Sequence, residues 1–237
     1  MKGTSEPQLS DIKKALNSAG ATHVLLDMDG TLLDKYFDDY FWGQLVPEKY
    51  AEKHRMTLAQ AHAELYEKYK AQEETLNWTD VDYWSAELDL DIMALKAQIR
   101  HLIEVHPHVE SFLREMRSRG KLIYIVTNAH DKVLDIKLKK TELGRYLDGA
   151  VTSAGIGYPK EDLRFWELAQ RELGFEKGRA LFVDDTLEVL KTARRYGLNL
   201  LVYKARATGK TEPLPSEDFV SIHDFDELLD SEASEEG

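Results

Sequence analysis

Two aspartates separated by one residue follow an apolar run near the start of the chain. Asp27 and Asp29 come directly after Val24-Leu25-Leu26, and Gly30 and Thr31 follow them. A carboxylate at the end of a buried strand needs a metal ion, a cation or several hydrogen bonds, because its desolvation is costly. Gly30 permits a tight turn with positive φ, and the Thr31 hydroxyl is expected to hydrogen-bond within that loop. The pattern is typical of a Mg²⁺ and phosphate site, although a surface turn with two solvated acids explains this stretch alone equally well.

Three further groups of polar residues follow apolar runs downstream. Residues 122–126 lead into Thr127-Asn128, Lys160 opens a segment with helical spacing, and residues 180–183 lead into Asp184-Asp185. Taken singly, Thr127 and the second acid pair are also compatible with helix caps, and Lys160 with a solvated lysine in a first helical turn. The four groups in order predict one catalytic site.

This order of an acid pair, a hydroxyl, a lysine and a second acid pair resembles the motifs of the haloacid dehalogenase-like (HAD) phosphohydrolases. The resemblance extends from about residue 20 to about residue 205. It implies that Asp27 is the nucleophile and forms a transient aspartyl-phosphate. It implies that Asp29 is the general acid for the leaving group and then the base for the attacking water.

The same resemblance implies Mg²⁺ as the cofactor, since this ion prefers oxygen ligands. The expected metal ligands are the carboxylates of Asp27, Asp184 and Asp185, the last directly or through water, and the backbone carbonyl of Asp29. The expected phosphate-binding groups are Thr127, Asn128 and Lys160.

The rest of the pattern predicts an α/β, Rossmann-like fold in which strands alternate with helices. The expected strands are 22–27, 121–127, 150–153, 179–184 and 198–203, and the expected helices are 11–19, 109–119, 131–141, 161–173 and 187–196. Residues 204–218 are expected to form a surface loop, and 219–229 a closing strand turn and a short helix. Right-handed crossovers between successive strands give a parallel sheet, whose ligands bind at the carboxyl ends of the strands. All four motifs fall at that edge.

The segment 35–105 interrupts the alternation of strands and helices. It has helical apolar spacing and holds three of the four tryptophans, and Thr57 and Asp80 are expected N-caps. We expect an all-helical cap here, inserted into a core made of residues 1–34 and 106–230, and a disordered acidic tail at 231–237. By resemblance, the cap closes over the site, excludes water and selects the leaving group.

Within the superfamily, the chain resembles the purine 5′-nucleotidases that act on GMP and IMP. The stretches that carry this likeness include Tyr40-Phe41-Trp42, Leu76-Asn77-Trp78, Asp82-Tyr83-Trp84-Ser85 and Thr127-Asn128-Ala129-His130. The likeness implies a purine monophosphate as substrate. The candidate specificity residues are Asp38 and Asp39 as acceptors from the base or ribose, Tyr40 and Trp42 as stacking surfaces, and His130. Five aromatic side chains are candidates to contact a purine, and most of them are expected to form the core of the segment while one or two line the pocket: Tyr40, Phe41, Trp42, Tyr83 and Trp84.

Other functions share this set of residues. A phosphoglycolate or sugar-phosphate phosphatase, or a phosphomutase, would use the same catalytic groups. A dehalogenase does not need Asp29 or the second acid pair, so their presence argues against one. A non-catalytic Mg²⁺-binding partner module is the alternative from a different class.

Composition limits the partners of the protein. The 237 residues carry 31 basic and 43 acidic side chains, a net charge of −12, which argues against nucleic acid or an anionic membrane as the main partner. The absence of cysteine excludes disulfides and thiolate metal sites. No apolar run approaches the roughly 20 residues of a membrane span, and the N-terminus lacks an apolar leader, so the cytoplasm is the expected location. The pattern does not predict an oligomeric state.

Overall fold

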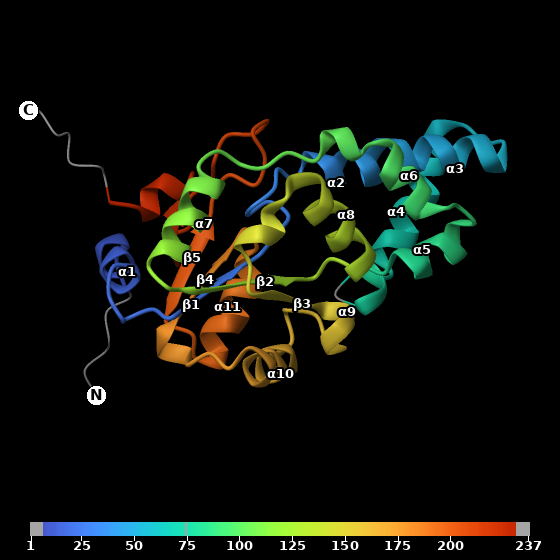
Figure 1. Ribbon diagram of the computed structural model, residues 1–237. Helices are drawn as coiled ribbons and strands as arrows, with labels where there is room; N and C mark the ends of the chain where they lie inside the picture. The colour runs from blue at the N-terminus through green and yellow to red at the C-terminus, as the bar shows by residue number, and fades with distance from the viewer. Residues whose placement is uncertain (1–6, 74, 231–237) are drawn as a thin grey trace, which may run out of the picture.

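The computed structural model describes residues 7–73 and 75–230. The predicted acidic tail at 231–237 lies outside the described residues. Figure 1 shows an α/β part, which contains every labelled strand, next to a purely helical part at the opposite end from α1 (Leu9–Leu16). None of the helices in the described ranges combines the length and apolar character that a membrane crossing requires.

A parallel sheet of six strands forms the centre of the α/β part. The strands lie in the order β3-β2-β1-β4-β5-β6 and all five neighbouring pairs are parallel. Their bounds are β1 (His23–Leu26), β2 (Leu122–Thr127), β3 (Gly149–Thr152), β4 (Ala180–Asp184), β5 (Leu200–Lys204) and β6 (Val220–Ile222). The five predicted strands are confirmed to within two residues. Strand order reverses between β1 and β4, and an open parallel sheet binds ligands at such a point.

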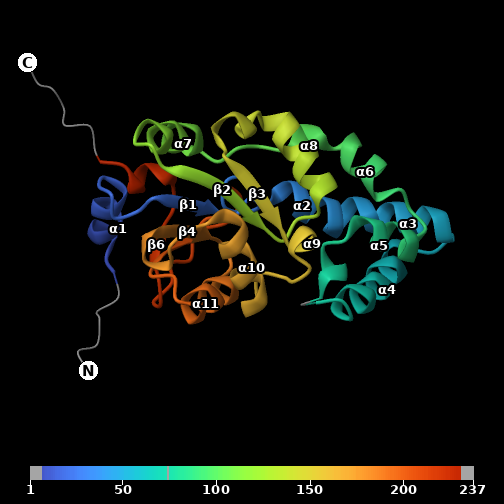
Figure 2. The same cartoon turned by 60° about the horizontal axis from the view of Figure 1, so that its bottom comes forward.

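Helices cover both faces of the sheet, as Figure 2 shows. Because side chains alternate along a strand, Val24 and Leu26 belong to one apolar cluster and Leu25 to the other. The first cluster includes residues of α1, α7 (Val109–Ser118) and α8 (Asp131–Thr141). The second includes residues of α10 (Leu163–Leu173) and α11 (Leu187–Tyr196). The sequence analysis did not predict the short helix α9 (Ser153–Ile156), and short turns of 3₁₀-helix complete this part at η4 (Leu143–Tyr146), η5 (Lys177–Arg179) and η6 (Phe225–Leu228).

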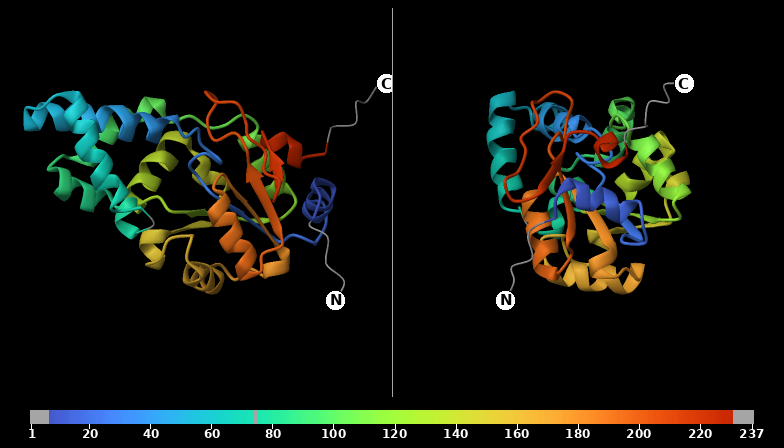
Figure 3. Two further views of the ribbon diagram at one scale, coloured as in Figure 1. Left: turned by 180° about the vertical axis from the view of Figure 1, so that it is seen from behind. Right: turned by 90° about the vertical axis from the view of Figure 1, so that its left-hand side faces the viewer.

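Residues 36–73 and 75–102 contain helices and no strand, and Figure 3 shows them grouped beside the sheet. Their elements are α2 (Tyr36–Tyr40), the π-helical segment η1 (Phe41–Leu45), α3 (Val46–His54), α4 (Leu58–Lys70), η2 (Leu76–Trp78), α5 (Val81–Leu88), α6 (Ile92–Gln98) and η3 (Arg100–Leu102). Side chains of Thr57 and Asp80 accept hydrogen bonds from the first turns of α4 and α5, which confirms both predicted N-caps.

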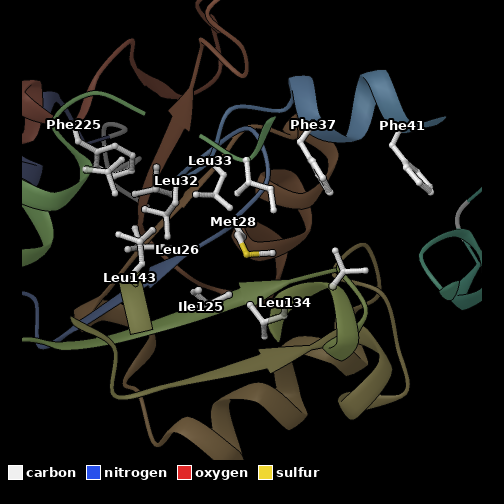
Figure 4. Packing of buried hydrophobic residues seen from close by; sticks show 14 of the residues in the cluster. Leu26, Met28, Leu32, Leu33, Phe37, Phe41, Ile125, Leu134, Leu143 and Phe225 are labelled. Carbon is white, nitrogen blue, oxygen red and sulfur yellow. The ribbon is translucent and has the colours of Figure 1, made fainter. Parts of the chain in front are cut away.

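One apolar core runs from the sheet into these helices. Figure 4 shows Met28 and Leu33, from the loop after β1, between the sheet residue Ile125 and the helical residues Phe37 and Phe41. All five side chains are at most 2% exposed and belong to the same cluster. This packing fixes the helical segment against the loop that carries Asp27 and Asp29.

Candidate active site

The loop after β1 turns sharply beneath the second acid pair. Gly30 has a φ of +88°, and a Cβ at this position would lie 2.2 Å from Oδ2 of Asp185. Only glycine therefore lets the two loops approach this closely. The Asp27 N–H donates to the Val183 carbonyl at 3.0 Å, which places the aspartate beside the end of β4. The expected hydrogen bond of the Thr31 hydroxyl is not formed: this buried oxygen has no partner among the described residues.

Lys160 joins the first acid pair to the second. Its Nζ lies 2.5 Å from Oδ1 of Asp27 and 2.7 Å from Oδ2 of Asp184, and the residue is 3% exposed. Burial opposes the charge, but the two carboxylates outweigh it and hold the pKa of Lys160 above its usual range. The helix predicted from residue 161 begins at Leu163 with Asp162 as its N-cap. The buried Lys160 therefore precedes the helix, which excludes a solvated first-turn lysine.

Asn128 fixes the loop that presents Lys160. Its Oδ1 accepts the Lys160 backbone N–H at 2.9 Å, and its Nδ2 donates to the Glu161 carboxylate at 3.0 Å. The Thr127 hydroxyl accepts the Ala129 N–H at 3.0 Å. Both residues also line the central cavity. The side chain of Asn128 thus has a structural role, while its backbone remains the expected phosphate contact.

The second acid pair lies where β4 ends. Asp184 is fully buried, and its Oδ1 accepts the Thr186 N–H at 2.8 Å. Burial raises the pKa of Asp184 and raises that of Asp185 to about 6, with a further contribution from the charge of Asp27 to both. Carboxylate oxygens of these three residues lie within 4.8 Å of one another. Three crowded acidic oxygens beside the Gly30 turn fit a Mg²⁺ ion, which would relieve their repulsion.

Asp29 has a partner that the sequence analysis did not predict. Lys137, on α8, places its Nζ 2.6 Å from Oδ1 of Asp29. Burial raises the pKa of Asp29 to about 6, although the Lys137 ammonium acts in the opposite direction. The spacing of Lys137 in the sequence could have indicated that it is buried, because Val133, Leu134 and Lys137 form the buried face of α8. A lysine within an apolar helical stripe is rarely solvated.

These groups open into one cavity of about 750 Å³ between the sheet edge and the helical segment. The sheet-side lining carries the charged groups Asp27, Asp29, Lys160 and Asp185, together with Thr127 and Lys35. The helical lining is mostly aromatic and apolar, and includes Trp42, His62, Leu65, Tyr66, Tyr69, Trp78 and Trp84. We call the first set the charged end and the second the aromatic end.

The predicted specificity residues divide between lining and core. Trp42, Asp38, Asp39 and His130 line the cavity, whereas Tyr40 is not among the described lining residues. Of the five aromatic side chains proposed from the sequence, Trp42 and Trp84 line the cavity, as expected for one or two of them.

Two of these polar residues already have protein partners. Asp38 binds Lys96 and Lys137 with its two oxygens, and these cations hold its pKa below the usual range although burial opposes them. Both carboxylate oxygens of Asp38 are therefore engaged by lysine side chains. His130 is the N-cap of α8, where its Nδ1 accepts the Lys132 N–H at 3.2 Å.

Sequence reasoning also missed Lys35 and the position of Trp78. Lys35 Nζ lies 3.6 Å from Oδ2 of Asp185. The negative charge of Asp185 raises the pKa of Lys35, although burial acts in the opposite direction. Trp78 is 43% exposed at the aromatic end, with its carbonyl accepting the Trp84 indole N–H at 3.0 Å. The sequence signal for Lys35 is its position shortly after Asp27 and Asp29. The position of Trp78 depends on packing between helices, so the sequence gives no signal for it.

Comparisons with known proteins agree with this geometry. The family model described as haloacid dehalogenase-like hydrolase matches residues 21–197. The GMP/IMP nucleotidase YrfG of Escherichia coli is 39% identical over 175 residues, which cover 74% of this chain and 79% of that protein.

Solved structures share the fold. A HAD phosphatase from Thermococcus onnurineus superposes with a TM-score of 0.74 at 25% identity, covering 87% of this chain and 95% of that one. A predicted phosphoglycolate phosphatase from Haemophilus somnus, at 16% identity and a TM-score of 0.65, covers 89% of this chain and 97% of its own and shows the fold alone. The motifs, the sheet and these matches together place the chain among the haloacid dehalogenase-like hydrolases, as a phosphohydrolase of that family.

Proposed function

We propose that this protein is a Mg²⁺-dependent 5′-nucleotidase that hydrolyses purine nucleoside monophosphates through an aspartyl-phosphate. The observation that carries the proposal is the cavity with two unlike ends. Its volume of about 750 Å³ lies within the range of roughly 300–1,000 Å³ common for small-molecule sites. A nucleotide has the same division, with a phosphate at one end and an aromatic base at the other.

The charged end supplies the groups that phosphoryl transfer requires. Asp27 attacks phosphorus, and Lys160, already bound to Asp27, neutralises charge on the phosphoryl oxygens. The Thr127 hydroxyl and the backbone of Asn128 complete the phosphate site. Asp29, whose pKa is raised to about 6, is available as a proton donor near neutral pH.

Asp27, Asp184 and Asp185 would hold Mg²⁺, with the Asp29 carbonyl as the further expected ligand. The ion supplies positive charge that reduces repulsion between the Asp27 carboxylate and the phosphate dianion. Lys35 adds a cation beside Asp185 on the same side of the cavity. Burial, with a smaller contribution from neighbouring negative charges, raises the pKa values of Asp184 and Asp185, so a cation among these acids would favour their ionised form.

The aromatic end supports a leaving group that carries a purine ring. Trp42, Tyr69 and Trp84 pack edge to face, with Tyr69 5.7 Å from Trp42 and 5.1 Å from Trp84 between ring centroids. Trp78 is the most exposed of the three lining tryptophans, so it offers a face for a base. The nucleotidase activity named for the Escherichia coli relative supports the same substrate class.

The test is phosphate release with Mg²⁺ across GMP, IMP, AMP, pyrimidine monophosphates, phosphoglycolate and hexose phosphates, with Asp27→Asn as the blank. A preference for GMP and IMP is expected. Preferred turnover of phosphoglycolate or hexose phosphates would leave the charged end as proposed and refute the role of the aromatic end. Mg²⁺ binding without turnover of any phosphate ester would favour a non-catalytic module instead.

A further inference from the structure

A chain of alternating charges connects Asp29 to the helical segment. Lys137 Nζ lies 2.6 Å from Oδ1 of Asp29 and 2.5 Å from Oδ2 of Asp38. Lys96 Nζ lies 2.7 Å from the other oxygen of Asp38. Both lysine side chains are only 2% exposed. Two carboxylates and two ammonium groups thus alternate across the boundary between the sheet and the helices.

Four elements contribute to this chain. Asp29 comes from the loop after β1, Lys137 from α8, Asp38 from α2 and Lys96 from α6. Aromatic rings enclose the ammonium groups: Lys96 Nζ lies 4.2 Å from the ring centre of Phe41, and Lys137 Nζ lies 5.2 Å from that of Phe37. Each ring attracts the ammonium group that faces it, which adds to the ionic contacts of both lysines.

Stability alone does not explain two buried lysines and two partly buried carboxylates at this place. Replacing a buried ion pair by packed apolar side chains is often neutral or stabilising, and both lysines occupy apolar faces of their helices. The geometry also leaves one carboxylate oxygen of Asp29 available. Oδ1 is held by Lys137, whereas Oδ2 has no hydrogen bond to any residue that the structure describes, and Asp29 lines the cavity.

We infer that Lys137 is a positioning residue, which holds Asp29 for proton transfer and couples its position to helices α2 and α6 through Asp38 and Lys96. The inference rests on the proposed role of Asp29 as acid and base. Placement of the helical segment over the cavity thereby determines whether the acid is aligned. The segment controls the chemical step in addition to contacting the base.

Both chemical steps depend on this alignment. In the first, an Asp27 oxygen bonds to phosphorus, the bond from phosphorus to the leaving oxygen breaks, and the carboxyl proton of Asp29 passes to that oxygen. In the second, the Asp29 carboxylate takes a proton from water as the water oxygen bonds to phosphorus. The bond from phosphorus to Asp27 then breaks and inorganic phosphate leaves. A displaced Asp29 slows both steps unless the leaving group needs no proton.

Lys137→Met tests the inference with two substrates in rapid-mixing experiments. Nitrophenolate leaves without a proton, so the first turnover of 4-nitrophenyl phosphate should keep its wild-type rate and release one nitrophenolate per enzyme. The following steady state should be slower by about 10²-fold, and the first turnover of GMP should be slowed similarly, as for loss of an acid–base group. The dissociation constants of both substrates, taken from the concentration dependence of the first turnover, should change little. Lys139→Met is the matched control, because that lysine of α8 is 74% exposed, and it should behave as wild type.

A purely structural role gives a different result and would overturn the inference. It predicts a smaller burst, in proportion to the folded fraction, and equal slowing of both substrates in the first turnover. If Lys137→Met does not fold, Lys137→Arg is measured in the same way and should recover part of the GMP rate by keeping a cation there. If the wild-type protein itself hydrolysed no phosphate ester, that result would instead refute the proposed function.

The coupling to the helices has its own variant. Asp38→Asn combined with Lys96→Met removes one charge of each sign and leaves the pair of Lys137 with Asp29 in place. We expect an intact burst with 4-nitrophenyl phosphate and a GMP first turnover reduced by about 10-fold, less than in Lys137→Met. A wild-type rate for GMP in this variant would show that Lys137 positions Asp29 without the helices.

Discussion

The two ends of the cavity are built in different ways. The charged end consists of residues at the carboxyl ends of neighbouring parallel strands or in the loops that follow, and each side chain has a defined ionic or hydrogen-bonded partner. The aromatic end consists of rings from separate helices, whose positions depend on packing against one another. Backbone topology therefore places the groups of the charged end, whereas side-chain packing shapes the aromatic end.

The difference separates chemistry from selectivity. A change at the charged end should affect every phosphate ester that needs the altered group. A change at the aromatic end should affect only substrates with a base to contact. Lys137, Asp38 and Lys96 lie between the two sets and join them. The following variants test whether the two ends are as independent as their construction indicates.

The largest effect is expected for Asp27→Asn. The amide is nearly isosteric with the carboxylate but is not a nucleophile, so turnover of all substrates should fall by roughly 10³-fold or more. Lys160 keeps Asp184 as a partner, so the fold should persist. Phosphate release and circular dichroism measure the two quantities. Wild-type rates in this variant would refute the covalent mechanism.

Gly30→Ala should damage the charged end through the backbone. A Cβ at this position would lie 2.2 Å from Asp185 Oδ2, and the φ of +88° is unfavourable for alanine. We expect destabilisation of about 1–3 kcal/mol and weaker Mg²⁺ binding, because Asp185 must move. Thermal unfolding and Mg²⁺ titration measure these changes.

Gly178→Ala is the control for Gly30→Ala, since an added Cβ there meets nothing within 4 Å. It should leave both the free energy of unfolding and the affinity for Mg²⁺ unchanged. Equal behaviour of the two alanine variants would show that Gly30 is not required for the approach of Asp185.

The response to pH should also come from the charged end. Burial raises the pKa of Asp185 to about 6, above the unfolded value near 3.9. The metal-free folded state therefore binds more protons than the unfolded state between these values, and its stability falls as pH rises through this window. Mg²⁺ requires ionised carboxylates, so its stabilising effect should increase as pH rises through about 6.

Melting temperatures with Mg²⁺ and with a chelator, at about pH 5 and about pH 7.5, measure this linkage. The Mg²⁺-dependent increase should be larger at the higher pH. Asp185→Asn should reduce the difference between the two pH values, because it removes one of the titrating ligands. An increase that is independent of pH would contradict the assignment of these acids as the metal site.

Much of the charged end could be predicted from the sequence. Asp27, Thr127 and Asp184 end or follow apolar strands, and a parallel sheet brings such positions together whatever the details of packing. Lys160 followed from the same order of motifs. Local contacts were harder to predict. The Thr31 hydroxyl has no hydrogen-bond partner among the described residues, and the helix after Lys160 begins at Leu163, two residues later than expected, because Asp162 is its N-cap.

The connection between the two ends could not be predicted in the same way. Lys96 and Lys137 each lie on an apolar helical face, and that spacing marks them as buried. Their common partner, Asp38, is 58 and 99 residues away in the chain. Such a partner becomes visible only when the helices are packed. For the same reason, the sequence named Tyr40 as a lining residue and missed the position of Trp78.

Trp78→Ala should give the smallest effect and the most selective one. Loss of a stacking surface costs about 1–3 kcal/mol per base, so KM for GMP should rise by roughly 5- to 150-fold. Turnover of phosphoglycolate, which has no base, should keep its wild-type kinetics. Leu76→Ala is the matched control, from the same short helix but not among the described residues that line the cavity. Equal losses on both substrates would show that Trp78 supports the charged end and that the two ends are not independent.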